Sequence, residues 1–258
     1  MPFGKLVFER REAVIQVTLN RPERLNALDA ALIGELTAAA GMIREDNSVR
    51  AVLLAAGGRA FCSGADLTGD VTTDVETSLR DGFNPMISAW FNLPVPVVVA
   101  VQGIAAGAGM SLALAGDIVL AAHSAVFIQL FAPKLGLMPD LGSSFHLPRT
   151  VGSARAKGLA LLGDPLSASD AAAWGLIWAC VDDETLGAES LRLVDRLARG
   201  PTQAYRQIKA VLNEQPPRTL ADQLQRELEG QVELGATRDF AEGLAAFRAK
   251  RPPAFRGD

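Results

Sequence analysis

The most constraining feature of this 258-residue chain is a run of apolar, mostly β-branched residues that ends in a glycine-rich turn. Residues 95–101 (VPVVVAV) are apolar on both faces, which favours a central strand covered on both sides. Residues 102–110 (QGIAAGAGM) are mostly small, and residues 111–115 predict a helix. The turn is therefore expected at a helix N-terminus, where free N–H groups favour an anion or a developing negative charge.

The turn does not match the common motifs that it superficially resembles. A dinucleotide-binding fingerprint would need a third glycine where Leu112 stands, and a P-loop would need a Gly-Lys-Ser/Thr ending. A nucleophile elbow around Ser111 lacks its second glycine. Close packing of a helix against a strand is the remaining alternative for these small residues, and this stretch alone leaves it open.

A second junction of the same type occurs earlier in the chain. Residues 49–56 predict another buried strand, and the small residues 57–67 (GGRAFCSGADL) follow it. In open α/β folds ligands collect beyond the carboxyl ends of the strands, so both turns are expected to face one site. Backbone N–H groups near Ala65 and near Ala108 would then converge on one carbonyl oxygen as an oxyanion hole.

The rest of the pattern alternates strands with helices, which predicts a parallel or mixed sheet with helical crossovers. The C-terminal part is helical from about residue 186 to 250, and its apolar faces could pack on a neighbouring subunit. The other predicted elements are a hairpin over 5–19, helices over 27–44, within 75–92 (with a possible cap at 72–74), over 153–163 and over 168–174, strands at 117–121 and 125–128, and a last short strand after 178.

Composition excludes several classes of protein. A net charge of −4 argues against nucleic-acid binding, which needs a basic surface. No signal peptide and no apolar run long enough to cross a bilayer is found, so we expect no membrane partner. Cys62 and Cys180 match no metal or redox spacing and predict reduced thiols and a cytoplasmic location. With only two histidines, His123 and His146, a His-rich metal site is not expected.

One carboxylate stands among apolar neighbours in the loop of residues 134–142 (KLGLMPDLG). This residue, Asp140, has two interpretations that local sequence leaves open. It could cap the helix that begins near Gly142. Alternatively, burial raises the pKa of its carboxyl group and makes it a proton shuttle.

Five groups of residues, taken in order, resemble the crotonase family, also called the enoyl-CoA hydratase/isomerase superfamily. The resemblance covers nearly the whole chain and implies an α/β fold, a spiral of ββα repeats over residues 1–190, with a helical trimerisation region over 191–258. It also implies a homotrimer or a hexamer of paired trimers. The five groups are 20–22 (NRP) with 25–28 (LNAL), 61–67 (FCSGADL), 102–103 (QG) with 106–109 (AGAG) and Asp117, 135–137 (LGL), and 147–149 (LPR).

The resemblance implies acyl-CoA thioester substrates, in which coenzyme A is part of the substrate, and no separate cofactor or metal. The N–H groups of Ala65 and Ala108 would hold the thioester carbonyl. Two of the implied contacts have alternatives, because Arg24 could be a solvated loop charge and Asp66 a helix cap. The residues implied to bind CoA or substrate are Arg24, Leu25, Ala27, Ser63, Asp66, Leu67 and Gly107, together with Lys250 and Phe255, which would reach a neighbouring subunit's ligand.

The chain departs from the family's hydratases at two positions. Those enzymes carry one catalytic glutamate on the helix after the oxyanion turn and a second in a later loop. Here Ser111 takes the first position, filling the space of the missing glutamate or binding water, and Leu130 or Phe131 takes the second. Activation of water by two glutamates is therefore not available.

Asp140 lies where isomerases of the family carry an acid. Its segment 136–142 and residues 160–163 (ALLG), 173–178 (AWGLIW) and 181–184 (VDDE) are similar to the isomerases of ring 1,2-epoxyphenylacetyl-CoA in phenylacetate breakdown. The sequence thus predicts an acyl-CoA isomerase in which Asp140 removes and returns a proton. The alternatives are an enoyl-CoA hydratase and a non-catalytic acyl-CoA-binding homologue.

Five other side chains are expected to have structural rather than catalytic roles. Cys62 is expected to pack in the core, because no histidine partner lies near it in sequence. His146 could reach the site but is expected to be structural. A dehalogenase of this family would use an aspartate as nucleophile together with a placed histidine, which the sequence does not offer. The tryptophans are expected in the core rather than against substrate: Trp90, Trp174 and Trp178.

Overall fold

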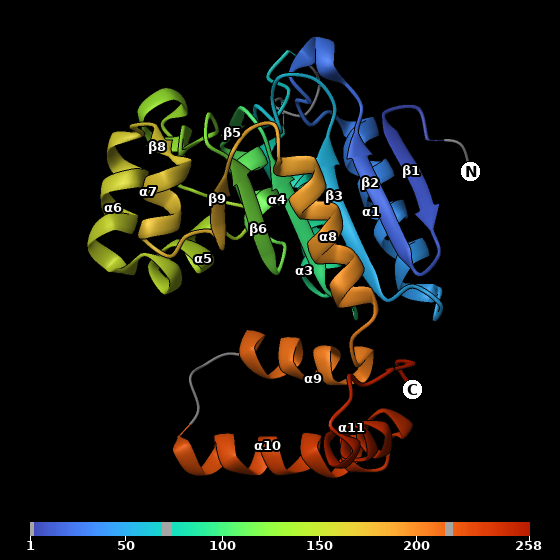
Figure 1. Ribbon diagram of the computed structural model, residues 1–258. Coiled ribbons are helices and arrows are strands. Elements are labelled where there is room, and N and C mark those ends of the chain that lie inside the picture. Colours follow the sequence, from blue (N-terminus) through green and yellow to red (C-terminus); the bar gives the residue numbers. More distant parts are fainter. Residues whose placement is uncertain (1–2, 69–73, 215–218) are drawn as a thin grey trace.

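The computed structural model describes residues 3–68, 74–214 and 219–258, and its centre is a six-stranded mixed sheet (Figure 1). The strand order is β1-β2-β3-β4-β6-β9, in which β1 and β2 form the predicted antiparallel hairpin and the other neighbours are parallel. The strands of this sheet are β1 (Leu6–Arg11), β2 (Val14–Leu19), β3 (Ala51–Ala56), β4 (Val97–Val101), β6 (Ile118–Ala122) and β9 (Ala179–Val181).

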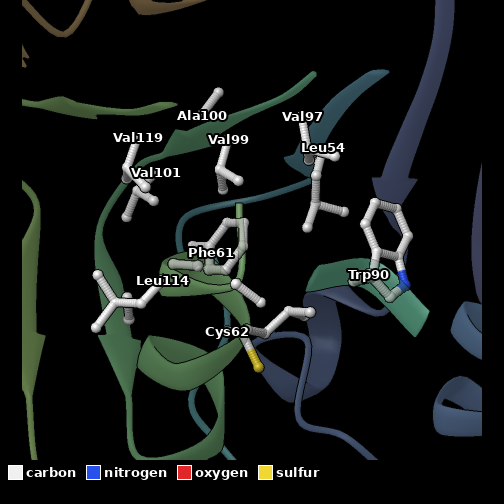
Figure 2. Packing of buried hydrophobic residues seen from close by; sticks show 14 of the residues in the cluster. Leu54, Phe61, Cys62, Trp90, Val97, Val99, Ala100, Val101, Leu114 and Val119 are labelled. Atoms are coloured by element: carbon white, nitrogen blue, oxygen red, sulfur yellow. The ribbon is translucent and has the colours of Figure 1, made fainter. Parts of the chain in front are cut away.

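The strand that the valine run predicts lies in the middle of the sheet. All five residues of β4 are buried, and Val98 pairs with Leu53 on one side and Ile118 on the other. A continuous apolar strand needs cover on both faces, and helices provide it here. Figure 2 shows Phe61 and Cys62 packed below the valines of the sheet, with Trp90 to one side.

A second, three-stranded sheet lies at one end of the large one. It consists of β5 (Ile104–Ala106), β7 (Val126–Ile128) and β8 (Leu166–Ser167), in the order β5-β7-β8, and Cys62 joins it by a bridge to Ala105. The sequence analysis did not predict β5 or β8. Successive passes of the chain leave the large sheet and enter the small one, from β3 to Cys62, from β4 to β5 and from β6 to β7. This is the predicted spiral of repeats.

The helices agree with the predicted positions to within a few residues. Helix α1 begins at Ala30 rather than residue 27, because the side chain of Asp29 caps it by accepting the N–H of Leu32 (2.9 Å). A cap was predicted at residues 72–74. Residues 72 and 73 lie outside the described part of the chain, and Asp74 caps α2 by accepting the N–H of Thr77. Ser167 caps α7, as its spacing to Asp170 predicts.

Helical bounds in chain order are as follows. They are η1 (Pro22–Arg24), α1 (Ala30–Glu45), α2 (Val75–Thr77), η3 (Ser78–Phe83), α3 (Asn84–Phe91), α4 (Ala108–Leu114), η4 (Phe131–Leu135), α5 (Ser143–Thr150), α6 (Gly152–Leu162), α7 (Ala168–Ala173), α8 (Leu186–Ala198), α9 (Thr202–Asn213), α10 (Leu220–Gly235) and α11 (Arg238–Ala249). Among the helices in the described part of the chain, none has the length and apolar character needed to cross a bilayer.

The tryptophans follow the core prediction only in part. Trp90 is 1% exposed, and its indole N–H donates to the carbonyl of Leu36 (3.0 Å). Trp174 is partly buried against the core, with the Arg155 guanidinium over its ring. Trp178 is 71% exposed, so the core prediction is wrong for this residue. Its indole lines a surface cleft beside α9 instead.

The C-terminal helices α9, α10 and α11 form a separate layer below the sheet, whereas α8 lies against the sheet itself (Figure 1). The boundary that we predicted between residues 190 and 191 therefore lies inside α8. Polar contacts tie the layer to the core. The ammonium of Lys209 donates to the carboxylate of Asp117 (2.6 Å) and to the carbonyl of Val95 (2.8 Å), and Arg50 donates to Thr202 (3.0 Å).

We predict that Lys209→Met weakens this attachment. Burial raises the pKa of Asp117 and lowers the pKa of Lys209, and each charge partly offsets the shift of the other. Removing the cation leaves the partly buried carboxylate of Asp117 with the N–H of Val97 (2.7 Å) but without its counter-charge, so the free energy of unfolding at pH 7 should fall by about 2 kcal/mol. Urea denaturation measures this change.

The loss should shrink as the pH falls toward 4, because protonation removes the uncompensated charge of Asp117. The matched control is Lys209→Met combined with Asp117→Asn, which should be more stable at pH 7 than the single variant. If the single variant is as stable as the parent protein at pH 7, the pair does not hold the C-terminal layer.

Candidate active site

A cavity of about 120 Å³ lies where the two glycine-rich turns meet the Asp140 loop, and we call it the turn cavity. It brings together the three residues predicted to be catalytic, Ala65, Ala108 and Asp140, and three of the predicted binding residues, Ser63, Leu67 and Gly107. The remaining lining residues are Gly64, Phe83, Leu130, Phe131, Lys134, Leu135 and Leu141.

A larger cleft of about 660 Å³ lies between the sheet and α9. None of the predicted catalytic residues lines this cleft, and its partly buried charges, Asp117 and Lys209, pair with each other. We therefore place the candidate site in the turn cavity, where the reactive groups converge, and not in the larger space.

The first turn can approach the second because Gly64 has no side chain. A Cβ at Gly64, whose φ is +107°, would lie 3.0 Å from the carbonyl oxygen of Ala106. The flanking peptide groups are fixed, since the N–H of Leu28 donates to Gly64 and the N–H of Asp66 donates to Leu28. Among the described residues, none accepts a hydrogen bond from the N–H of Ala65 between them.

The second turn supplies a similar donor at the start of α4. The N–H of Gly107 donates to the carbonyl of Ile128 (2.9 Å), which leaves Ala108 as the next N–H, without an acceptor in the described part of the chain. The packing alternative is correct for Gly109, where a Cβ would lie 2.3 Å from the carbonyl oxygen of Cys62. Both explanations hold for this turn, which packs closely and presents a free donor to the cavity.

Asp140 lies in the loop between η4 and α5. Its Oδ1 is buried and has no hydrogen-bond partner among the described residues, and burial raises the pKa of the carboxyl group to about 6. The alternative that Asp140 caps α5 through its side chain is wrong. The N-cap of α5 is Gly142, and Asp140 contributes only its backbone carbonyl, which accepts the N–H of Ser143 (2.9 Å).

A buried polar network lies behind this loop. Gln129 donates through Nε2 to Oγ of Ser143 (3.0 Å), and Oγ of Ser143 is 2.7 Å from Oγ of Ser111. The Ser111 hydroxyl reaches the backbone carbonyls of Asp140 and Gly107, both at 3.3 Å. These three side chains are at most 1% exposed. The network ties the loop of the carboxylate to the helix that supplies the Ala108 N–H, and Ser111 itself does not line the cavity.

The structure places Asp66 next to the cavity but not on its wall. Its carboxylate accepts hydrogen bonds from Arg21 (2.7 Å) and from the hydroxyl of Thr68 (2.6 Å). These bonds hold the pKa of the Asp66 carboxyl group well below its usual range. Its oxygens therefore hold the turn in place, and no helix begins at this residue in the described part of the chain.

The other predicted CoA contacts lie outside the turn cavity. Arg24 is exposed at the end of η1, and the carbonyl of Leu25 accepts the N–H of Ser63 (3.0 Å), which places this segment beside the cavity wall. Ala27 is buried close by. Lys250 follows α11 as its C-cap, and Phe255 lies beside Gly243 in the C-terminal layer. Neither residue lines the turn cavity of its own chain.

The cavity also contains residues that sequence reasoning did not assign to the site. Phe83 belongs to a segment without an interpretable pattern, and Lys134 and Leu135 lie on the π-helical turn η4. For Leu141 the sequence offers one indication of a place in the site, its position directly after Asp140. Leu130 and Phe131 had been considered only as the place of a missing glutamate.

Two further sequence hypotheses are confirmed. Cys62 is fully buried, and burial raises the pKa of its thiol to about 12, so it packs and does not act as a nucleophile. His146 is structural, because its ring packs against Phe91 and Phe145 at centroid distances of 5.5 and 5.1 Å. Burial lowers the pKa of His146 to about 4, and its side chain does not line the turn cavity. In the described part of the chain, no group of three acidic, histidine or cysteine side chains could hold a metal ion.

We predict that Asp140→Asn stabilises the folded protein at alkaline pH. The pKa of Asp140 is about 6 in the folded protein against an ordinary value of 3.8, so ionising the carboxyl group destabilises the folded state. This cost is absent below about pH 4 and complete above about pH 6. At pH 8 the variant should gain about 1 kcal/mol, allowing for the partial exposure of the carboxylate. At pH 4 the two proteins should unfold alike. Urea denaturation at both pH values checks the difference, and equal stability at pH 8 would contradict the burial cost.

Comparison with known proteins identifies the family. Residues 9–258 match the model of the family described as Enoyl-CoA hydratase/isomerase. The chain is 45% identical over 253 residues to the 1,2-epoxyphenylacetyl-CoA isomerase of Escherichia coli (strain K12), covering 95% of this chain and 96% of that protein.

Two further matches carry the name of the hydratase. A "Probable enoyl-CoA hydratase" of Rhodobacter capsulatus is 45% identical over 260 residues, with both chains covered in full. The crystal structure of an enoyl-CoA hydratase from Bacillus anthracis superposes with a TM-score of 0.92 at 30% identity, covering 98% of this chain and 100% of that one. The chain therefore belongs to the enoyl-CoA hydratase/isomerase family, whose crotonase fold the sequence motifs predicted.

Proposed function

We propose that this protein is an acyl-CoA thioester isomerase that uses one acid/base group. The observation that carries the proposal is the composition of the turn cavity. Asp140 is the single carboxylate among its described lining residues, and Ala65 and Ala108, whose N–H groups have no acceptor among the described residues, line the same cavity. A pKa of about 6 lets this carboxylate accept a proton at neutral pH and give it back.

The chemistry follows from these three groups. The N–H groups of Ala65 and Ala108 donate to the thioester oxygen, which stabilises the negative charge that appears there when C2 loses a proton. Ionised Asp140 takes that proton from a 3-enoyl thioester, giving a dienolate. Protonated Asp140 then delivers a proton to C4, the double bond moves to C2–C3, and the carboxylate is regenerated.

A ring epoxide is the second candidate substrate of the same site, because the Escherichia coli relative bears the name of such an isomerase. Opening and expansion of 1,2-epoxyphenylacetyl-CoA to an oxepin thioester would use the same polarised carbonyl, with Asp140 guiding the proton. This substrate would place the protein in phenylacetate breakdown.

Hydration is the alternative activity, and the name of the Rhodobacter relative favours it. It requires a group that activates water beside C3. The two positions at which hydratases of the family carry glutamate hold Ser111 and Leu130 or Phe131 here. Ser111 bonds to Ser143 and to backbone carbonyls behind the cavity, and the other two are apolar. We therefore expect hydration to be slow.

We also propose the remaining family features for this chain. Coenzyme A enters as part of the substrate, beside Arg24, Leu25 and Ala27, without a separate cofactor.

The proposed assembly is a homotrimer or hexamer, in which Lys250 and Phe255 would reach the ligand of a neighbouring subunit. Large apolar side chains exposed on α9–α11 support this assembly. Among them, Leu212 is 75% exposed, Val232 67% and Phe247 84%. Two free cysteines, with the Cys62 thiol fully buried, are compatible with the cytoplasm.

The decisive experiment incubates a 3-enoyl-CoA and a 2-enoyl-CoA separately with the protein in deuterated water and separates the products by mass-resolved chromatography. We expect the 3-enoyl thioester to move its double bond and exchange deuterium, while the 2-enoyl thioester gains no water. Asp140→Asn should lower the turnover number at least a thousandfold, because no other carboxylate lines the cavity in the described residues.

Three outcomes separate the candidates. Efficient addition of water to the 2-enoyl thioester would favour the hydratase. Binding of acyl-CoA without exchange or isomerisation would favour a non-catalytic homologue. An unchanged turnover number in Asp140→Asn would contradict the assignment of the base, and calorimetric titration with a saturated acyl-CoA is the control that the variant still binds.

We predict a pH profile set by the same group. Because Asp140 must be ionised to remove the first proton, kcat/KM should fall about tenfold for each unit of pH below its pKa of about 6, and level off above it. Initial rates between pH 5 and pH 8 measure the profile, with circular dichroism at each pH as the control for folding. A flat profile over this range would contradict a base with a raised pKa.

A further inference from the structure

A second cavity adjoins the turn cavity on the far side of Leu141. It has a volume of about 280 Å³ and lies between α3 and α5, and we call it the α3–α5 cavity. Leu141 is the single described residue that lines both cavities. The residues that line the second cavity are Asn84, Ile87, Ser88, Phe91, Asn92, Leu141, Gly142, Phe145 and His146.

Leu141 is held between the two spaces by an uncommon backbone conformation. Its φ is +50°, in the left-handed region that side chains with a Cβ seldom adopt, and Gly142 follows with a φ of +84°. The side chain is only 4% exposed, so the surrounding protein packs around it. Because Leu141 follows Asp140 directly, the side chain that separates the cavities stands beside the proposed base.

The two cavities differ in what they can hold. At about 120 Å³ the turn cavity is smaller than most small-molecule sites, which measure roughly 300–1,000 Å³. Polar side chains of Asn84, Ser88, Asn92 and His146 form part of the α3–α5 cavity, and no carboxylate or Lys/Arg side chain lines it among the described residues. Its other walls are apolar and come from Ile87, Phe91 and Phe145. Such walls suit a hydrocarbon chain, which gains by leaving water.

We propose that Leu141 limits the length of the acyl group, by closing the route from the turn cavity into the α3–α5 cavity. The parent protein then buries compact acyl groups, a short chain or a ring, and the outer carbons of a chain of ten or more gain no burial beyond Leu141. The inference rests on the proposed function insofar as an acyl-CoA is the ligand, and it does not require the isomerase reaction.

The variants follow from the geometry. Leu141→Gly removes the separating side chain at a backbone position that glycine adopts freely, so we expect it to fold. Leu141→Ala is the second opening variant. Leu141→Met keeps a side chain of similar volume and is the matched control. Ser88→Trp fills the α3–α5 cavity from α3 without touching the turn cavity, because Ser88 lines only the former.

Binding is measured by isothermal titration with hexanoyl-CoA and dodecanoyl-CoA, which are saturated and have no double bond to move. In the parent protein and in Leu141→Met the two dissociation constants should agree within about threefold. In Leu141→Gly and Leu141→Ala, dodecanoyl-CoA should bind at least tenfold more tightly than hexanoyl-CoA. Adding Ser88→Trp to either opening variant should abolish this preference, and circular dichroism confirms the fold of each variant.

The outcomes separate this inference from the proposed function. The same ratio of dissociation constants in the parent and in folded opening variants overturns the role of Leu141. A preference for dodecanoyl-CoA that persists with Ser88→Trp also overturns it, because the chain would then lie elsewhere. Failure of the parent to bind either thioester overturns the acyl-CoA site and this inference with it. The expected ratios without turnover of a 3-enoyl-CoA would overturn the isomerase and leave the role of Leu141 supported.

Discussion

The site depends on the direct contact between two segments of backbone, residues 57–65 and 102–109. Glycine makes this contact possible three times. A Cβ at Gly103 would lie 2.0 Å from the carbonyl oxygen of Arg59, one at Gly109 would lie 2.3 Å from that of Cys62, and one at Gly64 would lie 3.0 Å from that of Ala106. Larger residues would drive the segments apart and separate the N–H of Ala65 from that of Ala108. The two donors of the proposed oxyanion hole are thus fixed by packing, which is possible because these positions lack side chains.

The same contact determines how the carboxylate is placed. Helix α4 begins at Ala108, and one turn later Ser111 bonds through Ser143 to the loop that carries Asp140. A fully buried hydroxyl network is favourable only when its members find partners, and here the partners are backbone carbonyls and a glutamine amide. The distance between acid and oxyanion donors is therefore set by the interior of the protein, and the exposed segment of residues 134–138 does not determine it.

Sequence reasoning could predict much of this because the fold follows local chemistry. The valine run of β4 needs cover on both faces, so the centre of the sheet was predictable. The glycines of both turns indicate that two backbone segments approach each other closely, so the positions of the Ala65 and Ala108 N–H groups were predictable as well. The packing of Trp178 was not, because an apolar ring gives no sign of which surface it will occupy. Nor was the position of Leu141 between two cavities, because one of them lies between α3 and α5, elements far apart in the sequence. The Ser111–Ser143–Gln129 network was hidden for the same reason, since its members are separated by 14 residues or more.

A cavity with one acid and apolar walls constrains the chemistry that it can support. Leu130, Phe131 and Leu141 remove water from around Asp140, and this desolvation raises the pKa of the carboxyl group toward neutrality. In the proposed isomerisation, one carboxyl group can then take the proton from C2 and deliver a proton to C4. A second carboxylate in so small a space would bring a like charge beside Asp140 and raise its pKa further. The absence of both hydratase glutamates and the burial of Asp140, the one acid among the described lining residues, are therefore parts of a single arrangement, and the proposed isomerase activity rests on it.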